Sequence, residues 1–218
     1  MPVNKEIIVL LHGLGRSKTS MWLLASRLED AGYYVRRVGY SSLDQTPDQI
    51  LDDVSSQINE CCQKHPQPVH FVGHSLGGLM VRAYLQNNRV DQLGRVVLLG
   101  TPNKGTQAVD HFSGGWLIDI LGPAAKALGT DSTSFPNSLE APYYPVGVIA
   151  GQISSRINDI VIPGKDDGVV SVEATEVDGM TDFIVIETGH SRMRYDREVA
   201  EQTIEFIKNG VFREKQKE

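Results

Sequence analysis

The stretch Val69-His70-Phe71-Val72-Gly73-His74-Ser75-Leu76-Gly77-Gly78-Leu79-Met80-Val81-Arg82-Ala83 decides the fold of this chain. Its first part is an apolar run typical of a buried strand, and its second part has the apolar spacing of a helix. Ser75 therefore lies where a strand turns directly into a helix. Gly73 and Gly77 flank it in the pattern G-x-S-x-G, in which the missing side chains let the backbone crowd together.

This position has two possible meanings for Ser75. A serine at a sharp strand-to-helix turn has its hydroxyl clear of the sheet, and the helix that follows points free backbone N–H groups into the same space. A negative charge that forms there would be stabilised. Serine is also a favoured helix N-cap, which needs no chemistry at all. The motif alone does not decide between the two interpretations.

Length and charge limit the possible functions. A chain of 218 residues can form one sizeable core, and no linker divides it, so we expect one domain over residues 1–218. The formal net charge is −6, from 21 Lys and Arg against 27 Asp and Glu. This balance argues against nucleic acid as a partner. The oligomeric state leaves no signal in the sequence.

The two cysteines and the apolar runs indicate a compartment. Cys61 and Cys62 are adjacent in an expected helix, which argues against an ordinary bridge between them, so we expect both as reduced thiols. No apolar run approaches the roughly 18–20 residues that span a bilayer. The first strand is expected at about Glu6, with no room for a signal peptide before it. We therefore predict a cytoplasmic protein, although a mature chain whose signal had been removed would look the same.

Strand and helix patterns alternate along most of the chain. We expect strands at residues 6–11, 33–40, 68–73, 94–100, 145–151 and 183–187, and helices at residues 20–31, 46–65, 76–89 and 196–208. Parallel neighbours need crossover connections, and helices supply them. The pattern predicts an α/β fold with a mainly parallel sheet of about six strands and helices on both faces.

Ligands bind beyond the carboxyl ends of the strands in such sheets. Five candidate residues follow a strand end and are therefore expected along one edge of the sheet: His12, Ser75, Thr101, Asp167 and His190. The alternation is suspended at residues 107–145, a segment whose apolar half includes Trp116 and Leu117. An insertion of this length is usually a lid or another functional loop, although its apolar half could equally be an extra helix packed permanently on the core.

Together these motifs resemble the α/β-hydrolase superfamily, and most of all a small bacterial-type lipase or esterase. The matching segments span nearly the whole chain: His12-Gly13-Leu14-Gly15, the elbow at 73–78, Gly100-Thr101-Pro102 with Gly105, Asp167-Gly168-Val169-Val170-Ser171, and His190. The resemblance implies an α/β-hydrolase fold trimmed of its usual first two strands. Asn103-Lys104 departs from the His-Arg that often follows Thr-Pro in related lipases.

The resemblance also implies a role for each site residue. Ser75 would be the nucleophile, His190 its base and Asp167 the carboxylate that orients the base, and no cofactor or metal is needed. A serine hydroxyl requires such a base, and the base requires a fixed tautomer. The backbone N–H groups of Leu14 and Leu76 would hold the oxyanion. Three further side chains are expected to contact the substrate: His12, Trp116 and Leu117.

Several alternatives stay open at this point. Asp166 or Asp159 could replace Asp167, and His12 and His74 could be histidines whose hydrogen bonds are satisfied in the core. We predict a serine hydrolase that cleaves small-molecule or lipid carboxylic esters through an acyl-enzyme. The same residues would serve an acyltransferase, thioesterase or amidase, and a non-catalytic binding protein of this fold is a further alternative.

Overall fold

The computed structural model describes residues 4–112, 116–153, 161–162 and 164–214, with the backbone alone at residues 116–119. Its sheet consists of β1 (Ile7–Leu11), β2 (Tyr34–Val38), β3 (Val69–His74), β4 (Leu93–Leu99), β5 (Val146–Gly151) and β6 (Asp182–Ile186). The strand order is β2-β1-β3-β4-β5-β6, and every pair is parallel. The prediction of a parallel sheet of about six strands is confirmed.

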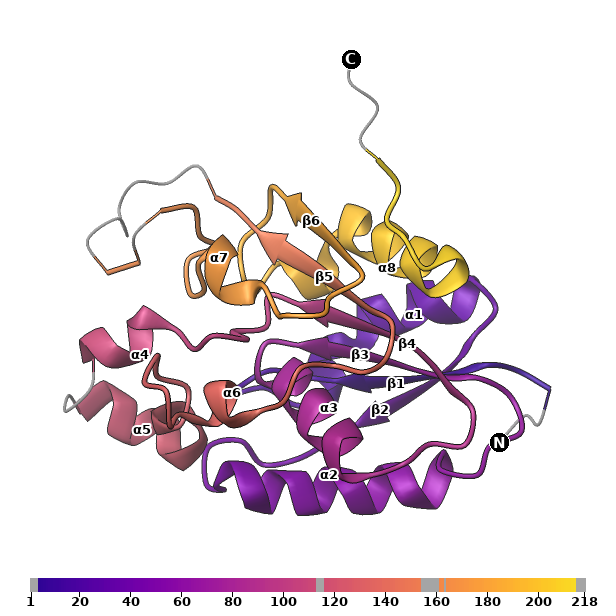
Figure 1. Cartoon of the computed structure of the whole chain (residues 1–218), viewed down its shortest axis with the longest axis horizontal. Helices are drawn as coiled ribbons and strands as arrows, with labels where there is room; N and C mark the ends of the chain where they lie inside the picture. Colours follow the sequence, from indigo (N-terminus) through magenta and orange to yellow (C-terminus); the bar gives the residue numbers. More distant parts are fainter. Residues whose placement is uncertain (1–3, 113–115, 154–160, 163, 215–218) are drawn as a thin grey trace.

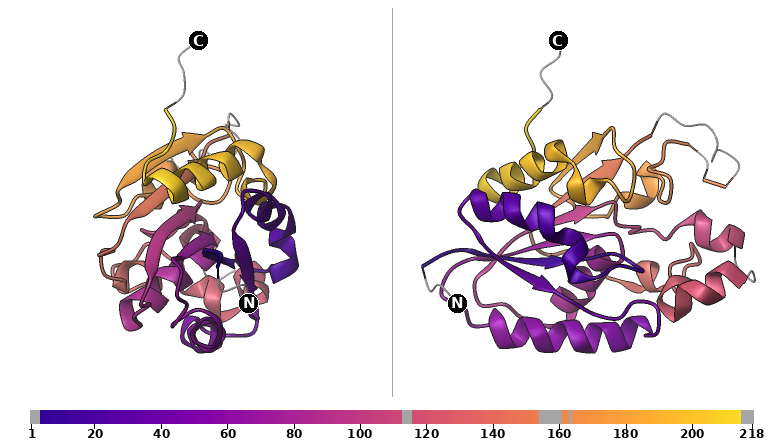
Figure 2. Two further views of the ribbon diagram at one scale, coloured as in Figure 1. Left: turned by 90° about the vertical axis from the view of Figure 1, so that its right-hand side faces the viewer. Right: turned by 180° about the vertical axis from the view of Figure 1, so that it is seen from behind.

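Helices cover both faces of this sheet (Figures 1 and 2). The α-helices are α1 (Trp22–Asp30), α2 (Pro47–Cys61), α3 (Leu76–Asn87), α4 (Gln107–Phe112), α5 (Trp116–Lys126), α6 (Phe135–Ser138), α7 (Val172–Thr175) and α8 (Arg197–Asn209). Two short 3₁₀ helices, η1 (Lys18–Met21) and η2 (Met193–Tyr195), precede α1 and α8. Helices α2 and α3 pack on one face, and α1 and α8 pack on the other.

The core follows from the alternation of side chains along buried strands. Every residue of β1 is fully buried, as a continuous aliphatic run in a parallel sheet predicts. Ile7, Val9 and Leu11 face α2 and α3, whereas Ile8 and Leu10 face α1 and α8. The apolar surface on both faces is thus removed from water, at roughly 25 cal/mol per Å².

Local signals set most helix ends. Thr46 accepts a hydrogen bond from the Gln49 N–H and the Gln49 side chain bonds back to the Thr46 N–H, which forms the capping box before Pro47. The structure also corrects the start of the helix expected at residues 20–31. A 3₁₀ turn replaces its first residues, and α1 begins at Trp22, whose side chain is 55 % exposed.

The two cysteines are the clearest correction. Cys61 and Cys62 form a disulfide, with their Cα atoms 3.7 Å apart. The helix expected at residues 46–65 would continue past both cysteines. Instead α2 ends at Cys61, and Cys62 already has non-helical dihedrals of φ −132° and ψ −17°, so the pair lies at a break in the helix rather than within it.

The segment 107–145 contains α4, α5 and α6, which lie beyond the carboxyl ends of the strands (Figure 1). Ala124 in α5 and Leu128 just after it belong to the hydrophobic core. The end of this apolar half is therefore packed on the core, which is one of the two arrangements expected from the sequence. Gly122, with φ 82°, breaks the helical path of α5. No helix in the described part of the chain combines the length and apolar character that crossing a bilayer requires.

Candidate active site

Ser75 has the strained backbone expected of a strand-to-helix elbow. Its φ of 55° and ψ of −125° make it the sole non-glycine residue with positive φ among those the structure describes. Such conformations cost about 1–3 kcal/mol and persist only where the surroundings enforce them. The Ser75 N–H donates to the Leu99 carbonyl over 2.9 Å, and its own carbonyl accepts from Gly78 N–H at 2.9 Å. Both bonds hold the elbow between β3 and α3.

The flanking glycines leave no room for side chains. A Cβ at Gly73 would lie 2.5 Å from the Gly78 backbone, and a Cβ at Gly77 would lie 2.5 Å from the His12 carbonyl oxygen. A Cβ at Gly78 would collide with the Thr101 side chain. The glycines of G-x-S-x-G-G therefore let α3 start directly against β1 and the loop after β4.

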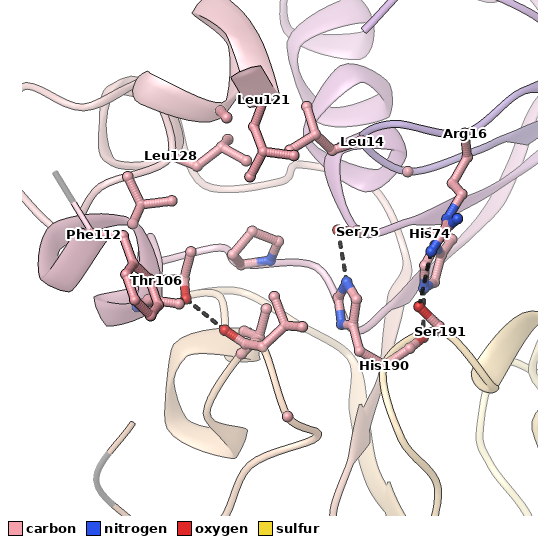
Figure 3. Close-up of a pocket in the computed structure, with 18 of the residues that line it drawn as sticks. Leu14, Arg16, His74, Ser75, Thr106, Phe112, Leu121, Leu128, His190 and Ser191 are labelled. Carbon is pink, nitrogen blue, oxygen red and sulfur yellow. Dashed lines mark hydrogen bonds between the residues drawn. The ribbon is translucent and has the colours of Figure 1, made fainter. Parts of the chain in front are cut away.

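Three side chains from distant loops form a continuous hydrogen-bond chain. His190 Nε2 lies 2.9 Å from Ser75 Oγ, a contact drawn in Figure 3, and His190 Nδ1 lies 2.7 Å from Asp167 Oδ2. The carboxylate of Asp167 is almost completely buried, and its other oxygen accepts from the N–H groups of Val169 and Val170 at 3.0 and 2.8 Å. The structure thus brings together the three residues that the resemblance implied.

Asp166 has a different role in the same loop. Its Oδ1 accepts from the Gly168 N–H at 2.7 Å, and its carbonyl accepts from the Ile153 N–H at 2.8 Å. These bonds shape the turn that presents Asp167 to His190. Asp159, the remaining alternative carboxylate, lies outside the described residues.

The loop after β1 is clamped beside the elbow. Gly15 N–H donates to Ser42 Oγ at 2.8 Å, and the Tyr40 hydroxyl donates to the His12 carbonyl oxygen. Within the described part of the chain, no protein acceptor pairs with the N–H of Leu14 or of Leu76. Leu14 lines the pocket next to Ser75, and Leu76 begins α3. Both N–H groups remain candidates for holding an oxyanion.

The sequence suggested that His12 contacts the substrate, but the structure places its side chain in the core beside Tyr40. Its ring is fully buried, does not line the pocket and stacks on Tyr40 with 4.1 Å between centroids. His12 Nδ1–H donates to the Gly13 carbonyl at 2.9 Å. The histidine supports the Leu14 loop from below, which matches the alternative of a satisfied core residue.

His74 is a second buried histidine, and it touches the site directly. Its Nε2–H donates to the His190 carbonyl at 2.9 Å, and its ring lies 4.9 Å from the His190 ring. Burial lowers the pKa of His74 well below its usual value, and the charges of His190, Arg194 and Arg16 lower it further. His74 therefore stays neutral and supports His190 without competing for its proton.

A mainly apolar pocket of about 360 Å³ opens at Ser75. On the side of α4 and α5 it is lined by Val109, Phe112, Leu121, Ala125 and Leu128, and Figure 3 shows Phe112, Leu121 and Leu128 on one side of Ser75. The side chains of Trp116 and Leu117, expected here from the sequence, lie outside the described part of the structure. The apolar run at 116–121 was a signal for this wall, but it did not reveal which residues face inward.

Other residues fill positions that the sequence left undefined. Asn103 accepts from Arg82 Nη1 at 3.0 Å and donates to the Thr175 carbonyl at 2.7 Å, so the loop after β4 is tied to α3 and α7. Arg16 and Arg194 also line the pocket, and no sequence motif had singled them out. Among the described residues, no cluster of three or more His, Cys, Asp and Glu side chains has an arrangement suited to a metal ion.

Three buried histidines predict how stability depends on pH. Burial lowers the pKa of His12, His70 and His74, so the unfolded chain binds protons that the folded chain does not. Their contribution to stability is complete above a pH of about 6.5, the usual histidine pKa, and is lost as the pH falls toward the lowered values. Each such group steepens the slope by up to about 1.4 kcal/mol per pH unit. Urea unfolding between pH 7.5 and 5 should show this decline, and His74→Asn should reduce the slope; an unchanged slope in H74N would contradict it.

Sequence comparisons with known proteins match this chain to thioesterases. The family model described as palmitoyl protein thioesterase matches residues 7–144, which include Ser75 but end before Asp167 and His190. The lysosomal thioesterase PPT2 homolog of Drosophila melanogaster is 30% identical over 104 residues, or 45% of this chain and 36% of that protein. The palmitoyl-protein thioesterase-dolichyl pyrophosphate phosphatase fusion 1 of Schizosaccharomyces pombe is 26% identical over 117 residues, 49% of this chain and 19% of its own length. The match thus spans about a third of the length of the Drosophila protein and about a fifth of the length of the Schizosaccharomyces protein.

Solved structures share the fold at lower identity. The mature lipase BlEst2 of Bacillus licheniformis superposes with a TM-score of 0.71 at 23% identity, covering 88% of this chain and 86% of that one. Phospholipase PlaB of Legionella pneumophila superposes with a TM-score of 0.68 at 17% identity, covering 95% and 57%. These superpositions establish the α/β-hydrolase fold. Because the family model covers more than half of the chain, this protein belongs to the palmitoyl protein thioesterase family.

Proposed function

We propose that the chain hydrolyses acyl esters, thioesters included, through a covalent acyl-enzyme at Ser75. The observation that carries the proposal is the hydrogen-bond chain Ser75–His190–Asp167 at the mouth of an apolar pocket. His190 Nε2 takes the hydroxyl proton as Ser75 Oγ attacks the acyl carbon, and then gives that proton to the leaving alcohol or thiol. Water repeats the cycle and releases the acid.

The geometry around Ser75 supports each part of this mechanism. Asp167 fixes the tautomer that leaves His190 Nε2 able to accept a proton, and two backbone N–H groups fix Asp167. The N–H groups of Leu14 and Leu76 would stabilise the oxyanion, each worth about 2.7–4 kcal/mol in comparable enzymes. The apolar wall from α4 and α5 would take the acyl chain.

Substitutions at these residues should separate their roles. Ser75→Ala should abolish hydrolysis of octanoyl esters and labelling by a fluorophosphonate, which should otherwise add mass to the Ser75 peptide. Asp167→Asn should lower kcat by up to about 10⁴-fold, because the amide no longer fixes the required tautomer. Asp166→Asn is the matched control and should retain far more activity. Hydrolysis that survives in S75A would instead indicate a non-catalytic binding protein with a contaminating activity.

The family match favours the thioester alternative over the oxygen ester that the sequence first suggested. We therefore expect the octanoyl thioester of N-acetylcysteamine to be hydrolysed with a higher kcat/KM than the octanoyl ester of the matching alcohol, N-acetylethanolamine. Both leaving groups are neutral and of similar size, so the comparison isolates the bond that is cleaved. If kcat/KM is at least tenfold higher for the oxygen ester, the protein is a carboxylic esterase and the thioesterase assignment is wrong.

The apolar wall predicts a dependence on acyl length. Val109 is partly buried in α4 and lines the pocket, so Val109→Trp should fill space that a longer chain needs. The ratio of kcat/KM for octanoyl over acetyl substrates should fall at least tenfold, since each methylene in an apolar pocket is worth about 1–3 kcal/mol. Val211→Trp, at an exposed position, should leave this ratio unchanged. If the octanoyl-to-acetyl ratio of kcat/KM is the same in V109W and V211W, the acyl chain does not bind along this apolar wall.

A further inference from the structure

Arg16 lies on the side of the pocket away from its apolar wall, and the charges of Arg16 and Arg194 both act on His74 on that side. Figure 3 shows Arg16, His74 and Ser191 on one side of Ser75, and Phe112 and Leu128 on the other. Arg16 Nη2 makes a long hydrogen bond of 3.4 Å to Ser191 Oγ. Arg194 lines the same pocket, in η2 directly before α8. If the acyl chain takes the apolar side, the leaving group extends toward this polar side.

Arg194 is nearly buried, and it has no charge partner among the described residues. The residue is 6 % exposed, and in the part of the chain that the structure describes its Nε and Nη1 atoms have no hydrogen-bond partner. Its guanidinium lies over the Tyr195 ring, 4.7 Å from the centroid. A guanidinium with two buried N–H-bearing nitrogens left unpaired is costly to bury, and binding of an anion offsets that cost.

The surroundings hold Arg194 in place but do not neutralise it. Arg27 Nη1 donates to the carbonyls of Tyr195 and Asp196 at 2.9 and 2.7 Å and so anchors η2 to α1. No carboxylate among the described residues forms an ion pair with Arg16 or Arg194, and the nearby Asp167 already pairs with His190. The chain as a whole is acidic, with a net charge of −6, yet two arginines without a carboxylate partner among the described residues line this one pocket.

We propose that Arg16 and Arg194 form an anion-binding subsite for a phosphate group carried by the leaving group of the substrate. The inference rests on the proposed function and specifies its substrate class: acyl thioesters or esters whose thiol or alcohol part bears a phosphate. The planar guanidinium forks of arginine match phosphate oxygens, and the two charges would orient the leaving group away from the acyl pocket. The phosphate could belong to a soluble thiol or to a lipid headgroup.

Two matched substrate pairs test this subsite. The first pair is octanoyl-coenzyme A and octanoyl-N-acetylcysteamine, which present the same thioester with and without phosphates. The second pair is dioctanoyl phosphatidic acid and dioctanoylglycerol. These two lipids carry the same acyl esters with and without a phosphate. We expect kcat/KM to be at least tenfold higher for the phosphate-bearing member of one pair, and to fall toward parity as the ionic strength rises. The pair that shows the preference identifies the source of the phosphate.

Variants then assign the preference to the two arginines. Arg194→Met and Arg16→Met should each reduce it at least fivefold, mainly through KM, and Arg194→Lys should restore part of it. Arg197→Met removes an arginine that is exposed and paired with Glu201, and it should leave the preference unchanged. If R194M does not fold, as judged by circular dichroism, R16M and competitive inhibition of the wild type by inorganic phosphate decide the question.

The outcomes distinguish this inference from the proposed function. The anion subsite is overturned if kcat/KM is equal within both pairs. It is also overturned if R16M and R194M keep the same preference for phosphate as R197M. In either case the proposal that the chain is a hydrolase still stands. Failure to hydrolyse any of the four substrates, together with no fluorophosphonate adduct on Ser75, overturns the proposed function.

Discussion

The positive φ of Ser75 is the constraint on which the rest of the site depends. A non-glycine residue does not hold φ 55° and ψ −125° unless its neighbours enforce it. Here β4 fixes the Ser75 N–H through Leu99, and α3 starts so close to β1 that Gly77 tolerates no Cβ. The same crowding positions the His12–Gly15 loop over the start of α3. One backbone conformation therefore sets both the direction of the hydroxyl and the location of the Leu14 and Leu76 N–H groups.

The electrostatics of the site follow from burial combined with the hydrogen bonds that Asp167 and His190 make. The Val169 and Val170 N–H groups replace water around one oxygen of the buried Asp167 carboxylate, and His190 bonds to the other oxygen. His12 and His74 are buried as well, but burial lowers the pKa of each, so they remain neutral. His190 is therefore in contact with one buried carboxylate, Asp167, and with the neutral imidazole of His74.

Much of this arrangement could be predicted from local sequence patterns. Continuous aliphatic runs such as 7–11 define buried parallel strands, and strand ends that meet at one edge bring Ser75, Asp167 and His190 near each other. The choice of Asp167 over Asp166 depended on the resemblance. The structure supplies its physical reason in the turn around Gly168, where adjacent carboxylates take opposite tasks.

Features decided by contacts distant in sequence, or by the exact residue at which a helix ends, could not be predicted. His12 follows a strand like the other site residues, yet stacking on Tyr40, 28 positions away, turns its ring into the core. The Cys61–Cys62 bridge depended on where α2 stops, and that end point lies within the usual uncertainty of helix boundaries. Arg16 and Arg194 come from loops at opposite ends of the chain and share no motif. Only the folded pocket shows that they line one cavity.

The pocket is divided by chemistry as well as by shape. Val109, Phe112, Leu121 and Leu128 offer no hydrogen-bonding side-chain groups, whereas Arg16, Ser191 and Arg194 offer donors without offering a negative charge. A substrate with one apolar and one anionic end would have a single favourable orientation across Ser75. In the reverse orientation the anion would be desolvated against the α4–α5 wall, and the alkyl chain would cover unpaired guanidinium groups. Discrimination between the two orientations thus arises from penalties against the wrong one as much as from contacts in the right one.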